Sequence, residues 1–338
     1  MTQTQTATKS SRIVLGTDWM IGYPNSSKWN IIPASKANTV LEKAVDLGIN
    51  AFDTARVYSS EGILGRFIRA NKIDREKVFI ISKGGHPGLF FKKSKPISNQ
   101  RLEKQLETSL KALDTEYIDV FLLHYDDPSV PTDEIVRWSL NLLETGKTRQ
   151  VGYSNFSLNR LTAITKTLES EGHTPWVSAE FNCLPIQNER WRGAQNISQN
   201  FEYLQFLKEK NIPFLAYSAL GRGYLKKQTD RIKKEYFKDF MRKSIDFYLQ
   251  KITGEKKNQD SPEMITQISK LTSLSEKYQV SPVIIAIEYV LRFSKSFHLV
   301  LGTSNSNHLE ESLQALKLNL SVEDIIYLSV VPKNLYIF

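Results

Sequence analysis

The 338-residue chain contains a single cysteine, Cys183, so it cannot form an internal disulfide. One thiol fits a reducing compartment, and we expect a cytoplasmic protein. No run of 18 apolar residues is present, which excludes a typical membrane-spanning helix. The first eleven residues are polar and contain no apolar segment, so the sequence indicates a disordered tail over 1–11 and no signal peptide.

Charge is unevenly distributed along the chain. The net charge is +9, and segment 222–257 carries twelve Lys or Arg against five Asp or Glu. The ordinary interpretation is a solvated helical face, and the functional one is attraction of an anionic cofactor or substrate. We expect no nucleic-acid partner, because no basic groove interleaved with aromatic residues accompanies the charge.

Short apolar, β-rich runs alternate with helical periodicity along most of the chain. One of the intervening segments places Leu102, Leu106, Leu110 and Leu113 on one helical face. The runs are RIVLG (12–16), NAFD (50–53), VFIISK (78–83), YIDVFLLH (117–124), QVGYS (150–154), WVSAEF (176–181), PFLAYS (213–218) and FHLVLG (297–302).

Eight such units predict the α/β class and a (β/α)8 TIM barrel that forms a single domain over 12–338. A basic insertion of about 222–260 follows the seventh run. A doubly wound open sheet is the alternative. Its usual GxGxxG is missing after the first run, where the chain reads VLGTDWMIG (14–22).

Four polar residues, Asp53, Tyr58, Lys83 and His124, have the order and spacing of one hydride-transfer site. A carbonyl that receives hydride at carbon needs a proton at oxygen, and a tyrosine can supply it if a nearby ammonium lowers its pKa from about 10. Lys83 would be that ammonium, Asp53 its counter-ion, and His124 a hydrogen-bonding partner of the substrate oxygen. Singly, each residue has an ordinary structural explanation; Asp53, Lys83 and His124 at successive strand ends favour the joint role.

The segment FDTARVYSSEGILG (52–65) closely resembles the aldo-keto reductase signature, with Asp53, Tyr58, Glu61 and Leu64-Gly65 in place. ISKGG (81–85) and DVFLLHYDD (119–127) resemble its next two blocks. The resemblance extends from about Arg12 to Ala315. It implies a TIM barrel, an extended nicotinamide cofactor bound without a Rossmann fold, and these four catalytic residues.

Further blocks imply the cofactor site. VGYSNFS (151–157), AEFN (179–182), AYSALGRG (216–223) and GTSNSNHLEES (302–312) resemble those that follow strands five to eight. Ser154 and Asn155 would hold the carboxamide, with Ser178 where glutamine is usual; Tyr217 would stack on the nicotinamide. The remaining cofactor residues by this resemblance are Thr17, Ser218, Leu220, Gly221, Gly302, Ser304, His308 and Ser312.

The adenosine-phosphate block departs from the family pattern. His308 stands where Arg or Gln is common, and Ser312 where Asn is common. A histidine is a weaker phosphate ligand than a bidentate arginine. The resemblance still favours NADP(H), with NAD(H) as the alternative.

Loop residues would form the substrate pocket, and those expected there are Trp19, Met20, His86, Tyr125 and Trp191. Aromatic walls suit many carbonyl compounds. Asp18, Arg56, His86 and Arg192 point to a sugar-like or acidic compound, although ordinary loop packing would produce the same residues.

We therefore expect a reversible NADP(H)-dependent reductase of aldehydes or ketones that acts on a small-molecule carbonyl or alcohol. The sequence leaves the oligomeric state open. A cofactor-binding regulatory or accessory subunit is the second hypothesis. A metal-dependent hydrolase built on Asp53, His86 and His124 is the third, and it lacks an HxH pair.

Overall fold

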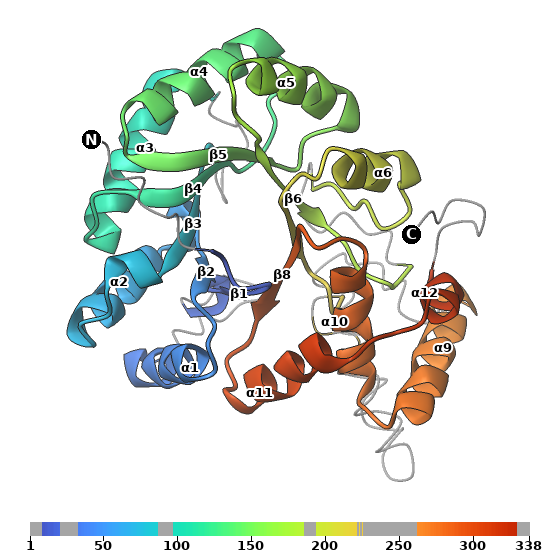
Figure 1. The fold of residues 1–338 in the computed structure, drawn as a ribbon. Helices are drawn as coiled ribbons and strands as arrows, with labels where there is room; N and C mark the ends of the chain where they lie inside the picture. Colours follow the sequence, from blue (N-terminus) through green and yellow to red (C-terminus); the bar gives the residue numbers. More distant parts are fainter. Residues whose placement is uncertain are drawn as a thin grey trace, which may run out of the picture.

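Eight parallel strands close into a barrel in which β1 pairs with β8 (Figure 1). The strands are β1 (Ile13–Gly16), β2 (Ala51–Asp53), β3 (Phe79–Gly84), β4 (Ile118–Leu123), β5 (Thr148–Ser154), β6 (Trp176–Glu180), β7 (Phe214–Tyr217) and β8 (Phe297–Gly302). This computed structural model describes residues 9–20, 33–86, 97–185, 194–221, 223, 225 and 262–329. The predicted single-domain (β/α)8 barrel is confirmed, and the open doubly wound sheet is wrong because the first and last strands pair.

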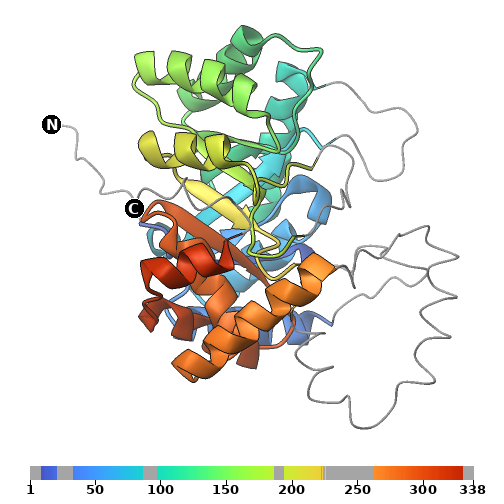
Figure 2. The same ribbon diagram turned by 90° about the vertical axis from the view of Figure 1, so that its right-hand side faces the viewer.

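Helices form the outer layer around the strands, as the side view shows (Figure 2). They are α1 (Ala34–Asp46), α2 (Glu61–Ala70), α3 (Asn99–Leu113), α4 (Thr132–Glu144), α5 (Leu158–Ser170), α6 (Phe201–Glu209), α9 (Pro262–Tyr278), α10 (Pro282–Arg292), α11 (Asn307–Leu313) and α12 (Val322–Leu328). In α3 the predicted leucine stripe is buried, and Ser98 caps the helix by accepting from the Arg101 backbone N–H. None of the described helices has the length and apolarity needed to cross a membrane.

The strand pleat sorts the side chains into two cores. Because successive residues of a strand point to opposite faces, every second residue faces the barrel axis. The barrel interior holds one apolar cluster: Val14, Ala51, Phe79, Ile81, Val120, Leu122, Trp176 and Leu215. The other cluster lies between strands and helices. On β2, β3 and β4 the last residue of this interior cluster lies two positions before Asp53, Lys83 and His124, respectively. These three residues therefore occupy the next inward-facing position of each strand.

A guanidinium–aromatic cluster joins the amino ends of β3, β4 and β5. The guanidinium carbons of Arg75 and Arg149 lie 4.0 and 3.7 Å from the centroid of the Tyr117 ring. Arg75 also donates to Asp119 Oδ2 at 2.8 Å, and this oxygen accepts from the Ile80 backbone N–H. The buried Asp119 carboxylate is thus satisfied by both charge and backbone, at the barrel end opposite to Lys83 and His124.

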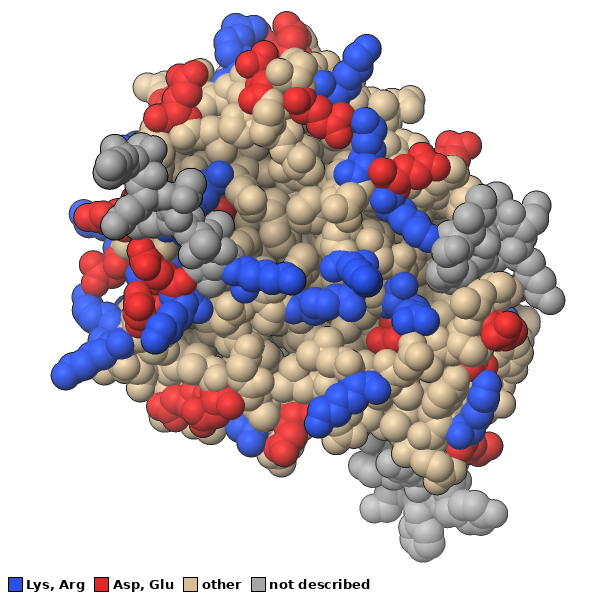
Figure 3. All heavy atoms as spheres, in the orientation of Figure 1, with Lys and Arg blue, Asp and Glu red and all other residues tan. Residues whose placement is uncertain are grey.

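Basic side chains also come from described parts of the chain. In the view of Figure 1, Lys and Arg gather near the middle of the face, and Asp and Glu lie mostly toward the rim (Figure 3).

Most of the predicted basic insertion lies outside the described residues, as do residues 1–8 of the predicted tail. The Ser11 backbone N–H donates to Asn50 Oδ1, and Asn50 Nδ2 donates to the Lys9 carbonyl.

Candidate active site

Three of the four predicted catalytic residues lie at the carboxyl ends of adjacent strands. Asp53 ends β2, Lys83 is the penultimate residue of β3, and His124 follows β4. Pairing is parallel, with Asp53 opposite Ile81 and Lys83 opposite Leu122. Because all three positions face the barrel interior, the side chains meet above the apolar cluster.

Tyr58 reaches the same place from a short 3-10 helix, η2 (Arg56–Tyr58), between β2 and α2. Its hydroxyl lies 3.5 Å from His124 Nε2, at the long end of the range for a hydrogen bond. Lys83 Nζ lies 5.0 Å from the centroid of the Tyr58 ring. The structure thus brings the phenol, the ammonium and the imidazole together, as the sequence led us to expect.

The ammonium of Lys83 forms a buried ion pair. Lys83 Nζ donates to Asp53 Oδ1 at 2.5 Å and to the Thr54 carbonyl at 3.0 Å. Both charged residues are about one-twentieth exposed, at 4% and 5%. Burial raises the pKa of the Asp53 carboxyl, and the adjacent ammonium opposes that rise. Removing either partner would leave a buried charge, so each needs the other.

His124 is held neutral near pH 7. Burial lowers its pKa well below the ordinary value, and the Coulombic effects of Lys83 and His86 act in the same direction. Its Nδ1 atom is buried and makes no hydrogen bond to the described residues. A neutral imidazole whose Nε2 lies beside the Tyr58 hydroxyl can form a hydrogen bond with an oxygen placed within reach of both groups.

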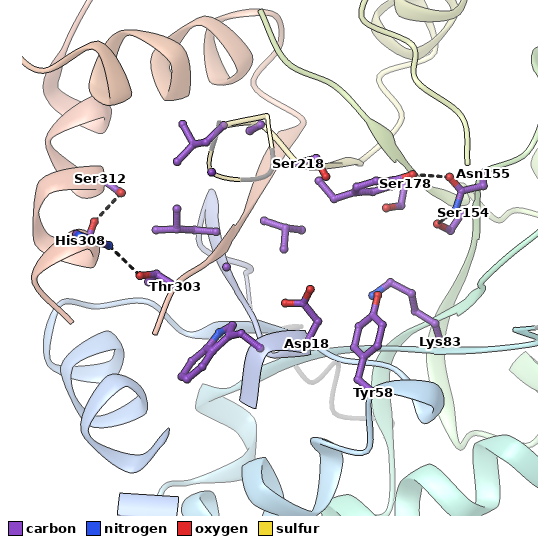
Figure 4. A pocket seen from close by; sticks show the side chains of 18 of the residues that line it. Asp18, Tyr58, Lys83, Ser154, Asn155, Ser178, Ser218, Thr303, His308 and Ser312 are labelled. Carbon is purple, nitrogen blue, oxygen red and sulfur yellow. Dashed lines mark hydrogen bonds between the residues drawn. The ribbon is translucent and has the colours of Figure 1, made fainter. Parts of the chain in front are cut away.

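The site opens into a cavity of about 440 Å³. Tyr58 and Lys83 lie side by side at one end, His308 and Ser312 lie at the other, and Asp18 lies between the two ends (Figure 4). The wall between the ends includes Ser154, Asn155, Ser178, Tyr217, Ser218, Leu220 and Gly302. An elongated ligand would therefore pass from β4 and β5 across β7 to the start of α11.

The family follows from a comparison with known proteins. The family model for the Aldo/keto reductase family matches residues 12–331. The chain belongs to the aldo-keto reductase family. It is accordingly an oxidoreductase of the type that uses nicotinamide cofactors on small-molecule substrates.

Individual relatives agree with this assignment. A provisionally named aryl-alcohol dehydrogenase of Schizosaccharomyces pombe is 27% identical to this chain, and the match covers 95% of this chain and 92% of the relative's length. Another, from Saccharomyces cerevisiae, is 28% identical over 95% and 93%. A crystal structure of a thermostable aldo-keto reductase with the inhibitor epalrestat has a TM-score of 0.68 at 20% identity, and the match covers 98% of this chain and 97% of that one. That structural likeness shows the fold.

Within the aldo-keto reductase cavity, Asn155 is bound from several sides. It adopts a left-handed backbone conformation, with φ 64°. Its Nδ2 donates to the His124 carbonyl at 3.2 Å and to Ser154 Oγ at 3.0 Å. Its Oδ1 accepts from the Tyr217 hydroxyl at 2.6 Å and from the Gln195 backbone N–H at 3.0 Å. The asparagine therefore fixes the Tyr217 ring and the chain after His124, and a carboxamide would have to exchange with these bonds.

Of the other residues predicted to contact the cofactor, Ser178 lines the main cavity. Three others, Thr17, Ser304 and Gly221, are not part of its lining. The hydroxyl of Ser178 lines the cavity and donates to the Leu215 carbonyl. Thr17 is buried and donates to the Asp53 carbonyl. Ser304 lines a second cavity beside α1 that is more open to solvent. Gly221 is buried in the turn after β7, where its N–H donates to the Ser218 carbonyl.

At the α11 end, His308 is engaged within its own loop. Its Nδ1 lies 3.1 Å from Thr303 Oγ1, whose hydroxyl donates to the Asn305 carbonyl. Asn305 Nδ2 lies 3.2 Å from His308 Nε2. Ser312 donates to the His308 carbonyl. A phosphate ligand role for His308 would therefore require this loop to release a ring nitrogen.

The predicted substrate pocket is only partly formed by the expected residues. Trp19, His86 and Tyr125 line the cavity. Met20 instead packs in the hydrophobic core with no exposed surface, because η1 (Asp18–Met20) turns its last side chain inward. Trp191 and Arg192 lie outside the described residues.

Aromatic rings surround His124 on the substrate side. The His86 ring lies edge-on to His124 and to Tyr125, with centroids 4.9 and 5.2 Å apart. Burial, with a smaller effect of Arg101, lowers the pKa of His86 to about 4. This wall is therefore uncharged at neutral pH.

Sequence reasoning did not select several cavity residues. Thr303 and Glu311 lie within the GTSNSNHLEES block, so their position there was a usable signal. Val283, at the start of α10, also lines the cavity. Nothing in its sequence context distinguishes it from an ordinary helix residue. Among the described residues, no group of three or more His, Cys, Asp or Glu is placed to hold a metal ion.

Proposed function

We propose that this aldo-keto reductase interconverts aldehydes or ketones with alcohols, with Tyr58 as the general acid and base. The observation that carries the proposal is the convergence of Tyr58, Lys83 and His124 on one cavity, while buried Asp53 holds the lysine. In reduction the Tyr58 hydroxyl would give its proton to the carbonyl oxygen, and in oxidation the phenolate would take it back.

Each neighbour has a separate part in that proton transfer. The ammonium of Lys83 stabilises the phenolate of Tyr58 electrostatically, and Asp53 keeps the ammonium in place. The neutral His124 binds the substrate oxygen and directs it to the Tyr58 hydroxyl. With substrate bound, the aromatic wall would exclude water from this end of the cavity and strengthen the electrostatic interactions within it.

The cavity fits a nicotinamide cofactor at its reacting end. The Tyr217 ring is clamped by its hydroxyl bond to Asn155 and offers a flat surface in the wall beside Ser154 and Ser178. When bound, the nicotinamide supplies hydride to the carbonyl carbon or accepts it from the alcohol.

We propose NADP(H) as the preferred cofactor, because the family resemblance favours it. Among the described residues that line the α11 end of the cavity, His308 is engaged in its loop, and Glu311 contributes a carboxylate. The described residues would offer a ribose 2′-phosphate little fixed positive charge there. We expect dissociation constants for NADPH and NADH within about tenfold of each other. Tighter binding of NADH would overturn the preference.

For the substrate we propose an uncharged aryl aldehyde or ketone first and a sugar-like aldehyde second. His86, Tyr125 and Trp19 form an aromatic, neutral wall. Arg56, expected to favour acidic compounds, is paired with Glu61 instead. The relatives named aryl-alcohol dehydrogenases favour the same choice.

The test combines binding with turnover. Quenching of protein fluorescence by NADPH measures binding, and a panel of aryl aldehydes, ketones, sugars and carboxylated aldehydes measures reduction. We expect binding together with reduction of aryl aldehydes. Cofactor binding without turnover of any compound would favour the accessory-subunit hypothesis. A cytoplasmic location and the absence of nucleic-acid partners stay predictions.

A further inference from the structure

Glu61 belongs to the signature segment but has no place in the chemistry described above. It is the first residue of α2 and has no exposed surface. Its carboxylate pairs with the Arg56 guanidinium and accepts a hydrogen bond from the Ser82 hydroxyl at 2.7 Å. A carboxylate buried to this extent is costly unless its partners are fixed, so its neighbours define its role.

Those neighbours belong to the two segments that carry the acid and the ammonium. Arg56 begins the 3-10 helix that ends at Tyr58. Ser82 directly precedes Lys83 on β3, and the pleat turns the two side chains to opposite faces of the strand. The Glu61 carboxylate therefore bridges the outer side of β3 and the start of the Tyr58 turn.

A second set of bonds ties down the end of that turn. The Ser60 hydroxyl lies 2.8 Å from Thr17 Oγ1 and 3.0 Å from Thr54 Oγ1. Thr17 in turn donates to the Asp53 carbonyl at 3.0 Å. Between these anchors Ser59 takes a left-handed backbone conformation, with φ 58°. The segment from Asp53 to Ser60 is thus fixed at both ends, and Tyr58 lies within it.

We propose that Glu61 is a positioning residue that, through Arg56 and Ser82, sets the placement of the Tyr58 hydroxyl relative to Lys83. This inference rests on the proposed function of Tyr58 as acid and base. Small displacements matter at such a site, because a shift of about 1 Å can cost about 100-fold in rate. Glu61 is not among the residues that line the cavity, so removal of its carboxylate should leave cofactor binding intact.

The decisive variant changes no net charge. Glu61→Gln alone leaves the Arg56 cation unpaired, and that cation would itself favour the Tyr58 phenolate and obscure the effect of a displacement. The double variant Arg56→Met with Glu61→Gln removes both charges. Ser82→Ala, which keeps the ion pair and loses one hydrogen bond, is a milder second variant in case the double variant does not fold. Glu107→Gln breaks the exposed pair with Lys147 and is the matched control.

The measurements are alcohol oxidation as a function of pH, the NADPH dissociation constant, and ultraviolet titration of each protein against the same protein carrying Tyr58→Phe. For the double variant we expect at least a roughly tenfold lower kcat, a Tyr58 titration moved to higher pH and an NADPH dissociation constant within about twofold of wild type. Ser82→Ala should show the same changes, smaller in size, and Glu107→Gln none.

A folded double variant with wild-type kcat and an unmoved Tyr58 titration would overturn the inference. So would a lower kcat with an unmoved titration, because that pattern fits a purely structural role. The titration needs no turnover. If wild-type protein reduces no carbonyl, the proposed function fails, while the titration still decides whether Glu61 positions Tyr58.

Discussion

Replacing Lys83 by methionine should raise the pH at which the enzyme becomes active in alcohol oxidation. Lys83 Nζ lies 5.0 Å from the centroid of the Tyr58 ring. At an effective dielectric constant of about 20, two unit charges at that distance interact by about 3 kcal/mol, which corresponds to about 2 pKa units. Asp53, on the far side of the ammonium, opposes part of this effect. We therefore expect the midpoint of the pH–rate profile to move upward by about 1–2 pH units in the Lys83→Met enzyme.

The assay is the pH dependence of kcat for oxidation of an aryl alcohol. The rate should follow the fraction of phenolate, so at pH 7 the Lys83→Met enzyme should be about 10–100-fold slower, and the difference should shrink toward high pH. Loss of the ion pair is a separate effect, because it leaves Asp53 buried without its partner. The double variant Asp53→Asn with Lys83→Met removes both charges. It should recover much of the lost stability and keep the altered pH profile.

A Lys83→Met enzyme whose pH profile coincides with that of wild type would contradict the proposed electrostatic role of the lysine. A uniform rate loss at every pH would also contradict it, since that pattern places the lysine in substrate binding and not in the ionisation of Tyr58. Equilibrium unfolding of each variant shows whether the measured enzyme is folded.

Three further predictions concern the acid, the packing and the pH dependence of stability. Tyr58→Phe should lower kcat by about 10²–10⁴-fold with cofactor binding unchanged; near-wild-type reduction would remove Tyr58 from the mechanism. Gly152→Ala would place a methyl group 2.3 Å from the Trp176 carbonyl oxygen and should cost about 1–3 kcal/mol in urea unfolding, whereas Gly62→Ala in α2, with its nearest neighbour at 3.4 Å, should not. Burial holds the pKa of His298 at about 4, below its ordinary value, so its contribution to stability is full above about pH 6.5 and is lost as pH falls toward 4. His298→Gln should therefore narrow the difference in unfolding free energy between pH 7 and 5 by about 1–2 kcal/mol; an equal difference in both proteins would contradict this.

Strand positions could be predicted closely because both faces of each strand are covered by apolar side chains. The run 78–83 corresponds to β3, Phe79–Gly84, and the run 117–124 to β4, Ile118–Leu123. The same alternation brings Lys83 and His124 to inward positions. The two-residue alternation and the predicted strand ends were therefore enough to predict that these side chains lie close together.

The loops could not be predicted in the same way, because tertiary hydrogen bonds set their side-chain directions. Asn155 has the expected place in the wall, yet its amide is bound by Tyr217 and the chain after His124. His308 is held by residues of its own turn. Met20 follows an aromatic residue that lines the cavity but is itself in the core. No periodic pattern in the sequence encodes these choices.

The Tyr117 ring between two guanidiniums bears on how this scaffold can be altered. It links the amino ends of β3, β4 and β5, at the end of the barrel remote from Tyr58. The residues that hold this end of the barrel are thus distinct from those that line the cavity. Substitutions around His86 should therefore change the cavity wall without affecting the contacts at Tyr117, and substitutions near Asp119 should leave the cavity wall unchanged.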